Sequence, residues 1–244
     1  VAPSRGLGDV YKRQTLTTHF YKGVFFMTQA TDTTPKQQAR AALANTIIQK
    51  LAKRNMEGYY CPTASEAVQQ VLSFIPAKSS VSFGGSVTLE ESGMLQALRE
   101  ADITLIDRGL ARTPQERKEV YLKSAASDFF FMSSNAITID GELINIDGNG
   151  NRLACLIHGP EHVIILAGMN KIVTDVPSGI ARVQNIATPA NAARLQTNTP
   201  CKVTGTCADC HSADCMCCQV VVTRHSRHTC LLYTSDAADE EDSV

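Results

Sequence analysis

The sequence predicts an α/β fold with a mostly parallel sheet flanked by helices. Helical stretches alternate along the chain with short apolar segments, an order typical of parallel strands that are joined by helices. Two of these segments, residues 129–132 and 162–167, are apolar without alternation. Strands that helices cover on both faces have this composition. We therefore expect both segments to be fully buried strands of the sheet.

Helix-capping signals place the elements of the amino-terminal half. A threonine precedes each of three predicted helices, which start near residues 35, 64 and 114: Thr34, Thr63 and Thr113. Proline or a glutamate three residues later strengthens these starts. Apolar residues recur every four positions through the first helix, and Gly58 is expected to end it. Short strands are expected between the helices, at residues 59–61, 80–83 and 103–106.

A glycine-rich loop follows the strand at 80–83, with the sequence Phe-Gly-Gly-Ser-Val-Thr-Leu-Glu-Glu. Thr88 and Glu91 form a capping box for the next helix. The glycines allow backbone N–H groups to approach a ligand, and the helix dipole favours negative charge there. The loop is therefore either an anion site or a tight turn capped by Thr88. It contains neither a Walker motif nor the dinucleotide-binding glycine pattern.

A polar region follows the buried strand at 129–132. Two short alternating runs are joined by Asp140-Gly141, a strong hairpin signal in which both turn positions favour positive φ. Asn135, Glu142, Asp147 and Arg152 are expected to gather at one end of the buried strand, where open α/β sheets bind ligands. Glu142 could act as a base or nucleophile, and the planar fork of Arg152 could bind a carboxylate or phosphate. Spacing alone favours the alternative, a solvated hairpin.

The carboxyl-terminal part combines helices with a cysteine cluster. Helices are expected over 152–158, 177–187 and 189–195, the last two separated at Thr188-Pro189. Of nine cysteines, six lie between Cys201 and Cys218. A Cys-x2-Cys pair with further thiols nearby suits Zn²⁺ or an iron–sulfur cluster. A reduced, metal-free tail is the alternative, and metal binding is favoured.

Composition excludes several classes of function. The chain has 244 residues, of which 43% are hydrophobic and 19% charged, and its net charge is -1. Without a basic run, nothing supports nucleic-acid binding. No apolar stretch reaches the ~20 residues that span a membrane. The residues at both ends, 1–14 and 230–244, resemble translated sequencing adapter. We expect Met27 to be the start, residues 15–26 to be read-through rather than a signal peptide, and the protein to be cytoplasmic.

Several motifs together resemble the lactate-utilisation (LUD) domain family, in its small stand-alone C-subunit type, over residues 34–228. They are the glycine loop at 83–91, Ser-Asn-Ala-Ile-Thr at 134–138, Asp-Gly-Glu-Leu-Ile-Asn-Ile-Asp-Gly-Asn-Gly-Asn-Arg at 140–152, Gly-Met-Asn-Lys-Ile-Val at 168–173, Thr-Pro-Cys at 199–201 and Gly-Thr-Cys-Ala-Asp-Cys at 205–210. The resemblance implies a fold like that of ribose-phosphate isomerases and CoA transferases. It divides the chain into residues 1–26, adapter-like or read-through; 27–198, the LUD-type α/β domain; 199–229, a cysteine-rich segment of the same domain; and 230–244, an adapter-like tail.

The resemblance also implies a function and a site. The function is that of a subunit of a cytoplasmic system oxidising L-lactate to pyruvate, which binds a small anionic ligand and iron–sulfur partner subunits. The implied catalytic residues are Glu142 and Asp147. The implied ligand-binding residues are Gly84, Gly85, Ser86, Thr88, Asn135, Asn151, Arg152 and Lys171. The family's cysteine pattern fits Cys201, Cys207, Cys210 and Cys217 as metal ligands, with Cys215 and Cys218 extra.

Two other functions stay open. One is a stand-alone enzyme similar to acyl/CoA transferases, with Glu142 as nucleophile, or to sugar-phosphate isomerases. The other is a non-catalytic scaffold whose cysteines dock an iron–sulfur partner. Fold likeness does not choose among them. The family also continues into a final strand that the tail replaces here, so we expect an open sheet edge.

Overall fold

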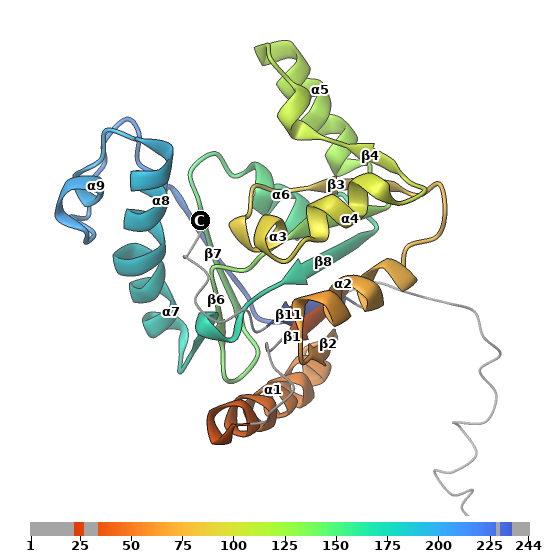
Figure 1. Cartoon of the computed structure of the whole chain (residues 1–244). Helices are drawn as coiled ribbons and strands as arrows, with labels where there is room; N and C mark the ends of the chain where they lie inside the picture. Colours follow the sequence, from red (N-terminus) through yellow and green to blue (C-terminus); the bar gives the residue numbers. More distant parts are fainter. Residues whose placement is uncertain (1–21, 27–33, 228–229, 236–244) are drawn as a thin grey trace, which may run out of the picture.

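The computed structural model of the chain describes residues 22–26, 34–227 and 230–235. Its main sheet has seven strands in the order β11-β2-β1-β8-β5-β3-β4, and their pairings are all parallel (Figure 1). The strands are β1 (Lys22–Phe26), β2 (Met56–Cys61), β3 (Ser80–Phe83), β4 (Thr104–Ile106), β5 (Phe129–Met132), β8 (His162–Leu166) and β11 (Cys230–Ser235). This arrangement confirms the predicted α/β class with a mostly parallel sheet.

The two apolar segments without alternation form neighbouring strands inside the sheet. Strand β5 pairs with β8, with Phe131 opposite Ile164. Every side chain of β5 is at most 3% exposed, and residues 163–166 of β8 are at most 1% exposed. The prediction of fully buried strands is confirmed, because both faces of the sheet are covered here.

Helices that precede or connect the strands flank this sheet. They are α1 (Pro35–Lys53), α2 (Ala64–Ser73), α3 (Val87–Glu91), α4 (Met94–Glu100), the 3-10 turn η1 (Arg108–Leu110), α5 (Pro114–Ala125) and α6 (Asn151–Ile157). Helix α2 packs against α4, and α5 packs against α6. The three predicted threonine caps are confirmed, since each side chain accepts a hydrogen bond from the backbone N–H three residues later. Among the described helices, none is long and apolar enough to cross a bilayer.

Two boundaries differ from the prediction. Gly58 does not end α1, which stops at Lys53, but lies within β2. A Cβ at Gly58 would come within 2.8 Å of Ile48 Cγ1 and 3.0 Å of Leu51 Cδ1, so glycine is needed there for close helix packing. The cap after β3 is Ser86, whose Oγ accepts from Leu89 N at 3.4 Å. The helix starts earlier than predicted because Ser86 is already positioned to cap it.

A second sheet of four strands, in the order β10-β7-β6-β9, carries the predicted hairpin. Its strands are β6 (Ala136–Thr138), β7 (Leu143–Asp147), β9 (Ile172–Val173) and β10 (Gln219–Thr223). Strands β6 and β7 are antiparallel, which confirms the hairpin. In the turn, Gly141 has φ of 81° and donates to Thr138 O at 2.8 Å, while Asp140 does not have positive φ. The turn is therefore a three-residue loop with one left-handed residue, not the expected two-residue turn.

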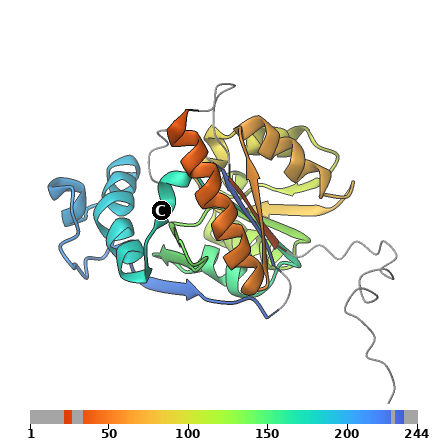
Figure 2. The ribbon, with the colours of Figure 1, turned by 90° about the horizontal axis from the view of Figure 1, so that it is seen from below.

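The last helices form a group of their own. They are the 3-10 turn η2 (Met169–Lys171), α7 (Val176–Arg182), the π-helical turn η3 (Val183–Ala187), α8 (Thr188–Leu195) and α9 (Pro200–Thr204). Figures 1 and 2 both show α7, α8 and α9 on one side of the molecule, away from α1 and α2. The predicted break at Thr188-Pro189 is wrong, since the backbone of Arg182, Val183, Ala187 and Thr188 stays helical. The π turn accommodates Pro189, which cannot donate a backbone hydrogen bond.

The segments set aside as foreign contribute strands of the main sheet. Strand β1 falls in the presumed read-through and pairs with β2 and β8. Strand β11 falls in the adapter-like tail and pairs with all of β2, from Met56 to Cys61. The edge of β2 is therefore covered, contrary to the expectation that it is open. A sheet edge pairs through backbone groups, and the Leu-Leu-Tyr-Thr of β11 suits a strand. The predicted start at Met27 lies outside the described residues.

The close approach of α1 to β2 gives a first prediction. We expect Gly58→Ala to destabilise the fold by about 1–3 kcal/mol, because the new methyl overpacks the contact with Ile48. Urea unfolding measures this loss. The double variant Gly58→Ala with Ile48→Ala should lose less than the sum of the two single variants. Simple additivity would mean that the two side chains do not compete for this space.

Candidate functional site

The side chain of Arg152 ties the second sheet to the end of β5. It is 7% exposed. Nη1 donates to Ser133 O at 3.1 Å and to Asn145 Oδ1 at 2.7 Å. Nη2 donates to Asn135 Oδ1 and to the Ile146 carbonyl, both at 2.9 Å. Burial lowers the pKa of Arg152, and the Asp147 carboxylate partly offsets this. The two terminal nitrogens of the fork thus already bind acceptors of the protein, and the expected ligand-binding role of Arg152 stays a prediction.

Glycine at position 84 makes this placement possible. A Cβ there would lie 3.2 Å from both Cγ and Cδ of Arg152. The Gly84 N–H itself donates to Phe131 O at 2.8 Å and so belongs to the sheet. Gly84 therefore acts by leaving room for the arginine.

A second buried cation, Lys171, joins the same network. Its Nζ donates to Thr88 Oγ1 at 2.7 Å and to Ser133 Oγ at 2.9 Å. Ser133 thus accepts from Lys171 through its hydroxyl and from Arg152 through its carbonyl. Arg182 donates to the Asn135 carbonyl at 2.8 Å. The structure brings the predicted residues Thr88, Asn135, Arg152 and Lys171 into one hydrogen-bonded cluster.

Next to this cluster lies a pocket of about 280 Å³, the arginine pocket. Its lining residues are Gly85, Arg108, Asp147, Gly148, Asn149, Asn151, Arg152, Asn191, Arg194, Leu195 and Met216. Four of them, Gly85, Asp147, Asn151 and Arg152, were predicted site residues. The lining holds three guanidinium groups and one carboxylate, so the pocket carries net positive charge and suits a small anion.

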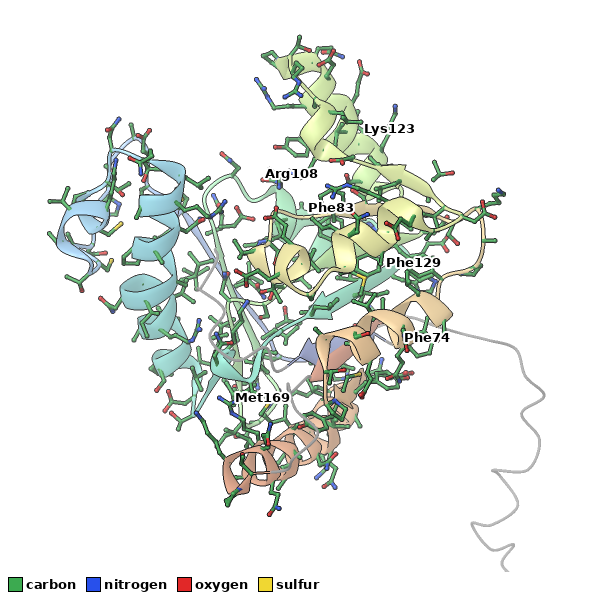
Figure 3. All side chains as sticks on the ribbon, in the orientation of Figure 1. Phe74, Phe83, Arg108, Lys123, Phe129 and Met169 are labelled. Carbon is green, nitrogen blue, oxygen red and sulfur yellow. The ribbon has the colours of Figure 1, made fainter. Side chains whose placement is uncertain are left out.

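The guanidinium groups of the arginine pocket differ in how many hydrogen bonds they already make to the protein. Arg108 extends over the glycine loop, with Nη1 3.1 Å from the position of a Gly85 Cβ (Figure 3). Within the described part of the chain its side chain makes no hydrogen bond or ion pair. Arg194 donates to Asn191 Oδ1 from Nε at 3.1 Å and also from Nη2. Arg108 and Arg194 therefore keep donors for a ligand, whereas Arg152 supplies charge.

Asp147 is the carboxylate of the arginine pocket. Its Oδ1 accepts from Asn149 N at 3.3 Å, and its Oδ2 lies 3.7 Å from Arg152 Nε. Oδ2 is buried and has no hydrogen-bond partner among the described residues. The side chain is 14% exposed, and Oδ1, which accepts one hydrogen bond from Asn149 N, has a further lone pair for the hydroxyl of a ligand.

Glu142 lies elsewhere. It precedes β7 while Asp147 ends it, and five strand residues span about 16 Å. The Glu142 carboxylate lies 3.6 Å from Arg54 Nη2 and 3.9 Å from Arg224 Nε. The predicted grouping of Glu142 with Arg152 is therefore wrong, because the hairpin turn carries Glu142 towards the end of α1. Ser86 serves as a helix cap.

The cysteines line a second cavity, of about 360 Å³, which we call the cysteine cavity. All six cysteines from 201 to 218 line it: Cys201, Cys207, Cys210, Cys215, Cys217 and Cys218. Each is a free thiol. No three Cys, His, Asp or Glu side chains of the described residues are placed to hold a single metal ion.

The thiols of the cysteine cavity are in different environments. Burial, with smaller contributions from the neighbouring Cys215, Cys207 and Cys201, raises the pKa of Cys217 to about 11. A hydrogen bond with Ser212 lowers the pKa of Cys210. Met216 lines both this cavity and the arginine pocket, and Cys218 N donates to Asp147 O at 3.1 Å. The two cavities thus share a wall.

Sequence reasoning missed several residues of the site. Asn145 is fully buried in β7 and binds Arg152. A lone amide in the apolar run Leu-Ile-Asn-Ile was a usable signal, because buried polar groups need partners. No such signal marks Arg108, Arg182 and Arg194 in the sequence. Most arginines on helices and loops are exposed, so an arginine there does not by itself indicate a site.

Comparisons with known proteins bear on the family. The model of the LUD domain family matches residues 44–232. A DUF162 family protein from Deinococcus radiodurans is similar in structure, at 12% identity and a TM-score of 0.43, over 81% of this chain and 98% of that one. The eIF2B delta of Chaetomium thermophilum is similar at 18% identity and a TM-score of 0.31, over 57% of each chain. No curated protein matches the sequence.

The Arg152 network gives a second prediction. We expect Arg152→Met to cost about 3–5 kcal/mol of unfolding free energy, because it leaves buried carbonyls and the Asp147 carboxylate without their cation. Chemical denaturation compares it with Arg194→Met, which removes an exposed arginine and should cost less than about 1 kcal/mol. Equal losses in the two variants would contradict the central position of Arg152.

Proposed function

Because the chain belongs to the LUD domain family, we propose that it serves lactate utilisation by binding a small 2-hydroxy carboxylate in the arginine pocket. In this proposal it is a stand-alone C-subunit-type component of a cytoplasmic system that oxidises L-lactate to pyruvate, and it acts with iron–sulfur partner subunits. The observation that carries the proposal is the guanidinium of Arg108 over Gly85, which lines a small cationic pocket together with Asp147.

The charges of the arginine pocket favour a carboxylate. Arg108 and Arg194 have donors left for a planar anion, and a guanidinium binds a carboxylate through two parallel hydrogen bonds. Arg152 adds a buried positive charge whose Nη1 and Nη2 donors are used within the protein and whose Nε lies 3.7 Å from Asp147 Oδ2. At about 280 Å³ the pocket falls below the ~300–1,000 Å³ of sites for drug-sized ligands. Its size therefore suits a molecule of few atoms.

The position of Asp147 favours a hydroxyl beside that carboxylate. A carboxylate accepts hydrogen bonds and repels a second anion, so it selects a ligand group that donates. The hydroxyl of a 2-hydroxy acid donates, whereas the carbonyl of a 2-oxo acid does not. The pocket should therefore prefer L-lactate to pyruvate, the substrate to the product.

The geometry favours this function over acyl or CoA transfer. That alternative needs Glu142 as a nucleophile beside the glycine loop. Glu142 instead forms ion pairs with Arg54 and Arg224 near the end of α1. The scaffold alternative needs no ligand, so ligand binding distinguishes it from the proposed function.

Calorimetric titration of the full chain with L-lactate tests the proposal. We expect Arg108→Met to weaken binding about 10- to 100-fold, as for the loss of one charge-assisted hydrogen-bonded contact. Arg117→Met is the matched control, since this exposed arginine on α5 lies outside the pocket. It should bind like the wild type. If wild-type protein shows no binding, or both variants bind equally, the arginine pocket is not the site.

The preference for a hydroxyl gives a further prediction. Asp147→Asn should weaken L-lactate binding more than pyruvate binding, because the amide can present its N–H₂ group to a carbonyl. Parallel titrations of the two acids measure the ratio of their dissociation constants. An unchanged ratio would remove Asp147 from ligand selection, even if the arginine pocket binds both acids.

A further inference from the structure

The segment that carries the cysteines lacks the usual sources of stability. Residues 205–218 contain no helix or strand, and no side chain from 202 to 218 is buried. Ordering a residue costs about 1–2 kcal/mol of backbone entropy, and apolar burial normally offsets this cost. Irregular segments of this length in compact domains are usually functional or disordered. Something other than a hydrophobic core must hold this segment.

The thiols of the segment converge on the cysteine cavity. Cys201 comes from α9, Cys207 and Cys210 follow in the loop with Cys-x2-Cys spacing, and Cys217 precedes β10. Cysteines from α9, from the loop and from the residues before β10 thus line one cavity. Ligands from successive parts of a chain that meet in this way are typical of a bound metal centre, whose binding energy orders the segment.

Polar groups are already placed at three of these sulfurs. Asp209 N donates to Cys207 Sγ at 3.4 Å. Thr188 Oγ1 lies 3.4 Å from Cys217 Sγ, and Thr199 Oγ1 lies 3.3 Å from Cys201 Sγ. Once a thiol is deprotonated, each of these groups can donate to the thiolate. Such hydrogen bonds stabilise and tune metal-bound sulfur.

The size of the cysteine cavity and the spacing of its thiols favour a cluster over a single metal ion. Zinc binds thiolates at about 2.3 Å, which brings its ligand sulfurs within roughly 4 Å of one another. No three ligands of the described residues have such an arrangement. The cysteines instead line a cavity of about 360 Å³, which is far larger than one ion. A cluster places several irons and sulfides between its cysteines, so thiols spread around a cavity can all bind it.

We propose that the cysteine cavity binds an iron–sulfur cluster through Cys201, Cys207, Cys210 and Cys217. Each thiol releases its proton as its sulfur bonds to iron; the iron, ferric or mixed ferric and ferrous, and the sulfide come from outside the chain, so no residue of the protein is oxidised or reduced. The cluster cross-links α9, the loop and the start of β10. Cys218, which is exposed and donates to Cys215 O at 3.2 Å, is not a ligand. The cluster would adjoin the arginine pocket through Met216, but the proposal stands independently of what that pocket binds.

Anaerobic reconstitution of the full chain with a mixture of ferric and ferrous iron and with sulfide tests this site. We expect two or four irons per chain with an equal amount of acid-labile sulfide, since four cysteines hold either type of cluster. A visible charge-transfer absorbance should accompany them. Cys207→Ser and Cys217→Ser should each lose at least half of the bound iron and this absorbance. Cys218→Ser and Cys61→Ser, which alter an exposed thiol and a core thiol, should keep both.

Three results would overturn the proposal. They are stoichiometric zinc that iron and sulfide do not replace, wild-type protein without bound metal, and equal cluster loss in Cys218→Ser and Cys207→Ser. Circular dichroism checks that the variants still fold. No side chain of residues 202–218 is buried, so the substitutions of Cys207 and Cys217 do not disturb the core. The ligand variants should therefore keep the helix and sheet signal of the wild type. If Cys207→Ser unfolds, Cys217→Ser gives the same comparison.

Discussion

The buried guanidinium of Arg152 is the interaction on which the rest of the site depends. A desolvated charge is tolerated only when its hydrogen bonds are satisfied. Here the end of β5, the loop before β6 and the strand β7 all supply acceptors to one side chain. This fixes the second sheet against the first. It also places Asp147, the last residue of β7, at the arginine pocket.

The buried position of Arg152 explains why small residues lie around it. Gly84 leaves room for the arginine side chain, and Ser133 links Arg152 to Lys171. The positive charge gathered here is only partly matched by Asp147, so the arginine pocket attracts anions. The cysteine cavity lies against the same wall through Met216. The proposed acid-binding pocket and the proposed cluster site are therefore neighbours.

Much of the fold could be predicted because local signals and burial agree. Capping threonines and unbroken apolar runs placed α1, α2, α5, β5 and β8. The failures have physical causes. A glycine after a helix usually ends it, but Gly58 lies in β2 and allows close packing against α1. Proline usually breaks a helix, but the π turn before Pro189 keeps the backbone helical. Strand β10 was missed because it depends on pairing with β7, a contact between distant parts of the chain.

The site was predicted in part for similar reasons. Arg152, Asn135 and Asp147 stand in a glycine-spaced polar stretch whose pattern is visible in sequence. Glu142 stands in the same stretch, yet the hairpin carries it away, since strand direction separates residues that are close in sequence. Arg108 and Arg194 reach the pocket from distant elements. Only the assembled sheet shows that they meet.

A crystal structure of the full chain with L-lactate would test the central claim most directly. We expect the carboxylate of lactate between Arg108 and Arg194 and its hydroxyl within hydrogen-bond distance of Asp147, with the Arg152 contacts unchanged. Lactate bound elsewhere, such as beside Arg54 and Arg224, or an Arg152 that leaves Asn135 and Asn145 to bind it, would contradict the account.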